Sequence, residues 1–214
     1  MCIRDREKAL QFEVGGKWRL DDVAARGDRV TFSAAAYYAE VQDFVNQTVQ
    51  FIDFSTGAFN PISGLLEVNG STTVSNVDAV LWGFEAEARY DDRRWYAGLG
   101  LSIPRGRAQD GGALGSIPQD KLFLTAGYRP VPEVELGARA TFRDGQDDIP
   151  AEGSETDGSA VLDLFIQWTP DRGPLEGARF LAGVDNVLDA TYRLHPNGLN
   201  QTGRAFKIAA SVAF

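Results

Sequence analysis

The chain has a single histidine, His195, which is the residue best suited to chemistry. An imidazole can act as a general base or can bind iron. A Ser-His-acid triad also needs a nearby serine and a third group that orients the ring. No serine-centred elbow motif accompanies His195, so the sequence predicts no catalytic residue and a protein that is not an enzyme. The two remaining interpretations are a ligand contact and a solvated loop histidine beside Pro196.

Acidic residues gather in one segment, as DGQDD at 144–148 and ETD at 155–157. Carboxylates at close spacing can hold Ca²⁺, but this spacing does not match an EF-hand loop. The only cysteine, Cys2, leaves no intrachain disulfide and no thiolate metal site. We therefore predict a solvated acidic loop and no metal site.

Composition narrows the class of protein. The 214 residues include 23 scattered glycines and are 43 % hydrophobic, which favours an all-β chain with many turns. The net charge of −9 argues against a nucleic-acid partner, for which a basic surface is expected. No uncharged apolar run reaches about 18 residues, so we expect no transmembrane helix, whereas transmembrane strands stay open.

The last twelve residues, GRAFKIAASVAF at 203–214, alternate between apolar and more polar positions. Strict alternation predicts a β-strand with one apolar face. Chain ends usually fray, so we expect a terminus with this pattern to be docked into a larger structure. Its apolar face consists of Phe206, Ile208, Ala210, Val212 and Phe214.

The same alternation recurs in eight earlier segments, each near the length that crosses a bilayer when the strand is tilted. The side chains opposite the apolar face are rich in Glu, Arg and Lys, as expected for a wet lumen, and aromatic residues gather near the strand ends. The alternative is a soluble β-sandwich, whose strands also alternate. The nine predicted strands are 8–20, 28–45, 81–90, 95–103, 120–129, 133–143, 159–168, 178–187 and 203–214.

Short and long connections between these strands alternate along the chain, and the longest covers residues 46–76. Up-and-down strands place the short turns at one rim and the long polar loops at the other, as in outer-membrane barrels. An odd strand count and two open edges are unfavourable in a bilayer. We therefore predict an all-β, antiparallel, up-and-down transmembrane barrel that is partial. Residues 7–214 are expected to be its C-terminal part, and residues 1–6 a non-native or disordered leader.

Four motifs resemble the TonB-dependent outer-membrane receptors. They are AYYAEVQDFV at 36–45, GFEAEARY at 83–90, GVDNVLDATYR at 183–193 and the final strand. Val187 and Leu188 stand where Leu-Phe is commoner in the family. The resemblance implies the last nine strands of a 22-stranded barrel in the outer membrane of a Gram-negative bacterium. It also implies that the plug domain, through which the TonB complex acts, is absent from this chain.

Two further segments resemble the haem and haemoglobin branch of this family: PRGRAQDGGALGSIPQDKLFLTAGYR at 104–129 and YRLHPNGLNQTGRAFK at 192–207. Gln119 replaces the second proline of the branch's I-P-P-D pattern. The resemblance implies a receptor and transporter for haem, including haem taken from haemoglobin, with haem as cargo and no resident cofactor. A ferric-siderophore receptor is the alternative within the family, and a passive channel or structural barrel is the alternative outside it.

The resemblance also assigns roles to residues of the last loop and the last strand. His195 is expected to contact the ligand, while Tyr192 and Arg193 would stack on a porphyrin or pair with its propionates. Phe214, with the apolar face that precedes it, matches the signal read by the barrel-assembly machinery. A further expected partner is outer-membrane lipid, which would meet the apolar face of the strands.

Overall fold

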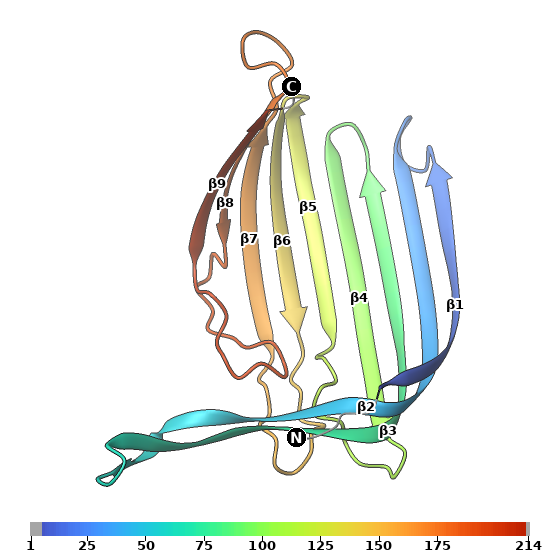
Figure 1. The fold of residues 1–214 in the computed structure, drawn as a ribbon. Coiled ribbons are helices and arrows are strands. Elements are labelled where there is room, and N and C mark those ends of the chain that lie inside the picture. The colour runs from blue at the N-terminus through green and yellow to red at the C-terminus, as the bar shows by residue number, and fades with distance from the viewer. Residues whose placement is uncertain (1–5, 213–214) are drawn as a thin grey trace.

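Residues 6–212 are described by the computed structural model, and they form one antiparallel sheet (Figure 1). Each strand is hydrogen-bonded to the next in chain order, which confirms the predicted up-and-down arrangement. Phe214 and residues 1–5, including Cys2, lie outside the described residues. The nine strands are β1 (Lys8–Asp21), β2 (Arg29–Asn60), β3 (Leu65–Asp91), β4 (Trp95–Ala108), β5 (Lys121–Val131), β6 (Val134–Arg143), β7 (Ser159–Trp168), β8 (Ala178–Asp185) and β9 (Ala205–Val212).

The sheet is curved and does not close, because β1 and β9 are its two edges (Figure 1). A partial barrel was expected from the odd number of strands. No second sheet covers either face of the wall in residues 6–212, so the soluble β-sandwich is disfavoured. The part of the chain that the structure describes also contains no helix long and apolar enough to cross a membrane.

One face of the sheet, called the outer face here, carries the predicted apolar residues, and many of their side chains are exposed. Leu164 is 43 % exposed and Ile208 is 90 % exposed. An apolar face of this extent is expected to meet lipid rather than water. Further exposed apolar side chains on this face are Leu10, Phe12, Val14, Phe32, Phe84, Leu99, Leu124, Leu136, Ile166, Phe206 and Val212.

Three stacked aromatic pairs lie on the outer face near the rim of short turns. Each pair joins residues that are directly opposite on neighbouring strands. This placement agrees with the predicted aromatic girdle, because amphipathic rings favour the membrane–water interface. The pairs, with their ring-centroid distances, are Trp18–Phe32 at 5.4 Å, Trp95–Tyr128 at 4.2 Å and Trp168–Phe180 at 5.3 Å.

On the opposite face, called the lumen face here, aromatic rings lie over glycines of the neighbouring strand. At Gly127, for example, an added Cβ would overlap the Tyr96 ring. These glycines are needed because each ring occupies the space of the missing side chain, which packs the cross-strand pair. The four pairs are Tyr37–Gly83, Tyr96–Gly127, Phe123–Gly100 and Phe165–Gly137.

The prediction of a very long loop at 46–76 is wrong, because β2 and β3 continue through it as a hairpin. Its Thr and Val residues favour extended backbone. Three register shifts interrupt the pairing, between Val41 and Phe44 and at two points further along. The turn at 61–64 is held by Asn60, whose Oδ1 accepts the backbone N–H of Ile62 at 2.9 Å. Figure 1 shows this hairpin leaving the wall and running across the rim of long loops.

Candidate functional site

The long connections meet at one rim of the sheet, where the β2–β3 hairpin lies against them (Figure 1). Residues 109–120 follow β4, residues 144–158 follow β6 and residues 186–204 follow β8. The first of these connections contributes Leu114 and Ile117 to a small apolar cluster with Ala79 of β3. The predicted ligand contacts His195, Tyr192 and Arg193 all lie in the third connection. We call these three connections and the hairpin the loop cluster.

His195 lies inside the loop cluster with both ring nitrogens hydrogen-bonded. Its Nε2 is 2.9 Å from the Gly115 carbonyl oxygen, and its Nδ1 is 2.9 Å from the Thr156 hydroxyl. A carbonyl can only accept, so Nε2 must carry the proton, and Nδ1 of the neutral ring then accepts from Thr156. Burial lowers the pKa of His195, and the bond to the Gly115 carbonyl only partly opposes this effect. The ring is therefore held neutral between two other connections.

Gln119 is a buried polar residue that joins the same connections. Its Nε2 donates to the carbonyl oxygens of Asp144 at 2.8 Å and Asp157 at 3.1 Å. Its Oε1 accepts the backbone N–H of His195 at 3.3 Å, and the residue is only 6 % exposed. The one position that departs from the I-P-P-D pattern thus supplies a side-chain amide that proline could not provide.

The β2 arm of the hairpin is tied to the same cluster. Asn46 is buried, and its Oδ1 accepts the backbone N–H of Gly115 at 2.9 Å. The Ser154 N–H donates to the Val49 carbonyl at 3.0 Å, and the Phe51 N–H donates to the Ser154 hydroxyl at 2.9 Å. Segments far apart in the sequence are therefore joined by buried or half-buried hydrogen bonds, which makes the loop cluster one connected unit.

Tyr192 and Arg193 contact different parts of the cluster. The Arg193 guanidinium lies over the Phe51 ring at 4.4 Å, while the Arg143 guanidinium lies 5.7 Å from the Tyr192 ring centroid. The structure thus places His195, Tyr192 and Arg193 in one loop, with separate neighbours. Their role as ligand contacts stays a prediction.

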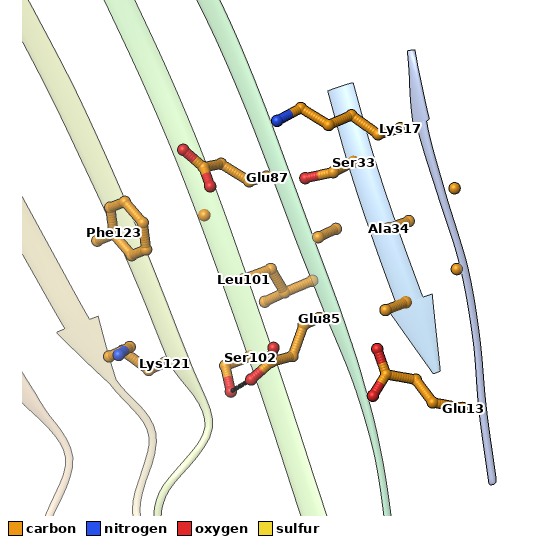
Figure 2. Close-up of a pocket in the computed structure, with 15 residues that line it drawn as sticks. Glu13, Lys17, Ser33, Ala34, Glu85, Glu87, Leu101, Ser102, Lys121 and Phe123 are labelled. Atoms are coloured by element: carbon orange, nitrogen blue, oxygen red, sulfur yellow. Dashed lines mark hydrogen bonds between the residues drawn. The ribbon is translucent and has the colours of Figure 1, made fainter. Parts of the chain in front are cut away.

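The lumen face of β1 to β5 contains a recess of about 610 Å³ (Figure 2). Small residues, including Gly15, Ala35 and Gly100, leave this space open. The predicted charged face is thus confirmed, and its mixed charges suit water or a polar domain inside a barrel. The charged side chains around the recess are Glu13, Lys17, Glu85, Glu87 and Lys121.

A second charged group lies on the lumen face towards the rim of short turns. Arg129 donates from Nη1 to Asp91 at 2.9 Å and from Nε to Glu135 at 3.2 Å. Glu135 also accepts the Tyr96 hydroxyl at 3.0 Å, and the Arg129 guanidinium lies over the Tyr96 ring at 4.8 Å. These satisfied pairs crosslink β3, β4, β5 and β6, which is a structural role.

The acidic loop shows no arrangement for a cation. Asp148 pairs with Arg107 at 2.9 Å. Within residues 6–212, no group of three or more His, Cys, Asp or Glu side chains is placed to hold a metal ion.

The family model "TonB dependent receptor-like, beta-barrel" matches residues 5–187. The chain belongs to this family. Members of the family are receptors rather than enzymes, and the protein is located in the outer membrane of a Gram-negative bacterium.

Two curated relatives are similar over most of the chain. The "Heme/hemopexin utilization protein C" of Haemophilus influenzae is 28 % identical over 97 % of this chain, and the "Hemin receptor" of Yersinia enterocolitica is 27 % identical over 93 %. The chain spans 30 % and 28 % of the lengths of these two relatives.

Solved structures agree on the fold. The "Copper transporter OprC" superposes with a TM-score of 0.74 at 21 % identity, covering 97 % of this chain and 31 % of that one. The FrpB iron transporter from Neisseria meningitidis superposes with a TM-score of 0.65 at 19 % identity, with the same coverage. At this identity the likeness shows the fold alone.

Sequence reasoning missed most of the hydrogen-bonded centre of the loop cluster. Asn46, Gly115 and Thr156 belong to polar loop stretches and carry no motif that announces a partner. Only Gln119 gave a signal, as the departure from a family pattern, and that signal did not indicate which groups its amide would bind.

Proposed function

We propose that this chain is the C-terminal part of the barrel of a TonB-dependent outer-membrane receptor for haem, including haem taken from haemoglobin. The observation that supports this most is the similarity over 97 % of the chain to the "Heme/hemopexin utilization protein C" of Haemophilus influenzae. In this proposal haem is cargo, the chain has no resident cofactor, and no residue is catalytic.

The proposal divides the work of the receptor between this chain and the rest of the protein. Residues 7–214 supply the last nine strands of a 22-stranded wall and part of the outer loops. The plug domain and its contact with the TonB complex belong to other parts of the polypeptide. The outer face of the sheet meets lipid, and the apolar face of β9 with Phe214 is read by the barrel-assembly machinery.

The geometry of His195 defines how it would bind haem iron. Nε2 carries the proton and donates to Gly115, so the lone pair on Nδ1 is the one suited to a metal. That lone pair now accepts the Thr156 hydroxyl. We propose that Thr156 moves aside when His195 contacts haem, and that Tyr192 and Arg193 approach the porphyrin from the same loop.

The alternative within the family is a ferric-siderophore receptor, which would share the same wall and loop rim. A passive channel or structural barrel is the alternative of another class. Transport through a channel needs no TonB, whereas transport through a receptor does. The dependence of transport on TonB therefore distinguishes the two classes, whereas the structure of the barrel wall does not.

The test is a haem titration of the complete receptor in detergent, followed by absorbance, for the unmodified protein and for His195→Ala. Uptake of haem by cells that express the receptor is measured with and without TonB. Arg179→Ala, a change at an exposed residue near the short-turn end of β8, serves as the control variant.

Saturable binding that weakens at least tenfold in His195→Ala, together with TonB-dependent uptake, is the expected result. Unchanged binding in His195→Ala keeps the haem receptor but removes His195 from the site. Binding of a ferric siderophore in place of haem decides for the alternative receptor. Uptake that continues without TonB decides for a channel.

A further inference from the structure

A hollow of about 410 Å³ lies on the lumen face of β6 to β9, beneath the last long connection. It is separate from the recess of Figure 2, which lies on β1 to β5. Arg139 and Arg143 line it from β6, Asp163 from β7 and Lys207 from β9, while Tyr192 contributes from the last connection. The hollow is therefore at the loop end of the wall, where a ligand that leaves the loop cluster would enter the lumen.

The positive charges of this hollow are only partly compensated. Lys207 is ion-paired with Asp185. Asp163 lies opposite Arg139 on the neighbouring strand, but its Oδ1 accepts the backbone N–H of Asn186 at 2.9 Å. Within residues 6–212, neither Arg139 nor Arg143 forms an ion pair.

Arg143 places an unsatisfied donor in the lining of this hollow. Its Nη1 is buried and has no hydrogen-bond partner among the described residues. A buried N–H of a guanidinium without a partner is unfavourable, so native proteins usually satisfy such groups. The Tyr192 ring, which also lines the hollow, lies 5.7 Å from this guanidinium and helps to hold it in place.

The two arginines suit carboxylates in particular. A guanidinium presents paired N–H groups that match the two oxygens of a carboxylate. Arg139 and Arg143 are four residues apart on one face of β6, so their Cα atoms are about 13 Å apart along the strand. Long side chains can converge over this distance on one ligand that carries two or more carboxylates.

We propose that this hollow is a carboxylate-binding subsite, in which Arg143 and Arg139 hold the carboxylates of a small ligand as it passes from the loops into the lumen. As applied to haem, whose two propionates are the carboxylates, the inference rests on the function proposed above. The subsite itself requires only a ligand with several carboxylates.

The test uses the complete receptor in detergent and three probes: haem, haem with both propionates esterified, and citrate. Haem forms are titrated by absorbance, and radiolabelled citrate is measured by equilibrium dialysis. The variants are the single substitution Arg143→Gln and the double substitution of Arg139→Gln together with Arg143→Gln. Arg179→Gln is the matched control, because it removes the same charge from a strand residue that does not line the hollow.

We expect haem to bind about 10- to 100-fold more weakly to the Arg143→Gln protein, from the usual strength of charge-assisted hydrogen bonds. Esterified haem should bind the unmodified receptor about as weakly as haem binds the double variant, because esterification removes the charges that both arginines would hold. If the receptor binds citrate but not haem, and the arginine variants lose citrate binding, the subsite is supported and the haem function is refuted. Equal haem affinity in all variants would overturn the subsite and leave the haem function standing. An equal loss in Arg179→Gln, or no binding of either haem or citrate, would also overturn the subsite.

Discussion

Replacing Gln119 by leucine should loosen the loop cluster and leave the wall intact. Leucine has a similar volume, so the main change is the loss of three hydrogen bonds, to Asp144, Asp157 and the N–H of His195. Each bond contributes about 0.5–1.5 kcal/mol net, which gives roughly 2–4 kcal/mol for the three together. Because Gln119 is only 6 % exposed, water cannot replace the amide unless the loops open.

Amide hydrogen exchange measures this opening directly. A loss of roughly 2–4 kcal/mol corresponds to exchange about 30- to 900-fold faster in segments 144–158 and 190–202. Amides in β5 to β7 should exchange as before. The control is Gln167→Leu, because within the described part of the chain the Gln167 amide makes one long bond, to Thr169 at 3.4 Å. If both loop segments exchange within about threefold of the unmodified protein, Gln119 does not join the connections and the reasoning is refuted.

Three other perturbations test separate parts of the structure. Burial lowers the pKa of His195, so its contribution to loop stability is complete above about pH 6.5 and is lost as the pH falls through the lowered value. Loop protection against exchange, corrected for the intrinsic rate, should therefore be lower at pH 5 than at pH 7.5, and equal protection at both would contradict this. Leu164→Arg places a charge on the outer face and should cost about 2–4 kcal/mol near the bilayer midplane, measured by urea unfolding in vesicles; a neutral result would mean that the face meets water. Gly127→Val would overlap the Tyr96 ring and should cost about 1–3 kcal/mol in the same assay. The loss should shrink when Tyr96 is also replaced by alanine, and additive effects would exclude the packing.

The wall was predictable because lipid imposes one simple rule on every strand. Period-two alternation located all nine strands and told the outer face from the lumen face, as Leu164 and Ile208 show. It failed at residues 46–76, where the β2–β3 hairpin extends beyond the wall (Figure 1). Where a strand does not face lipid, apolar and polar side chains need not alternate. The sequence pattern of this segment therefore predicts a loop.

The loop cluster was not predictable, since its bonds join polar groups that are distant in sequence. Asn46 meets Gly115, and Thr156 meets His195, across 69 and 39 residues. Asparagine, glutamine and threonine are also common in solvated loops. Their residue types therefore do not show whether a side chain bonds to a buried protein group or to water. The sequence located His195 in a loop, but only the fold shows that both of its nitrogens are engaged.

These bonds set a condition on the proposed haem contact. Nδ1 of His195 has one lone pair, so it cannot accept the Thr156 hydroxyl and bind iron at the same time. Ligation through Nδ1 must therefore break the tie between the last connection and residues 144–158. The free energy of breaking that tie opposes haem binding and lowers the affinity. Gln119 strengthens the same tie from the other side, because it holds both the His195 backbone and the carbonyl of Asp157. In the proposed contact, haem binding by His195 and opening of the loop cluster are one coupled equilibrium, so a change that favours the closed loops would weaken the contact with iron.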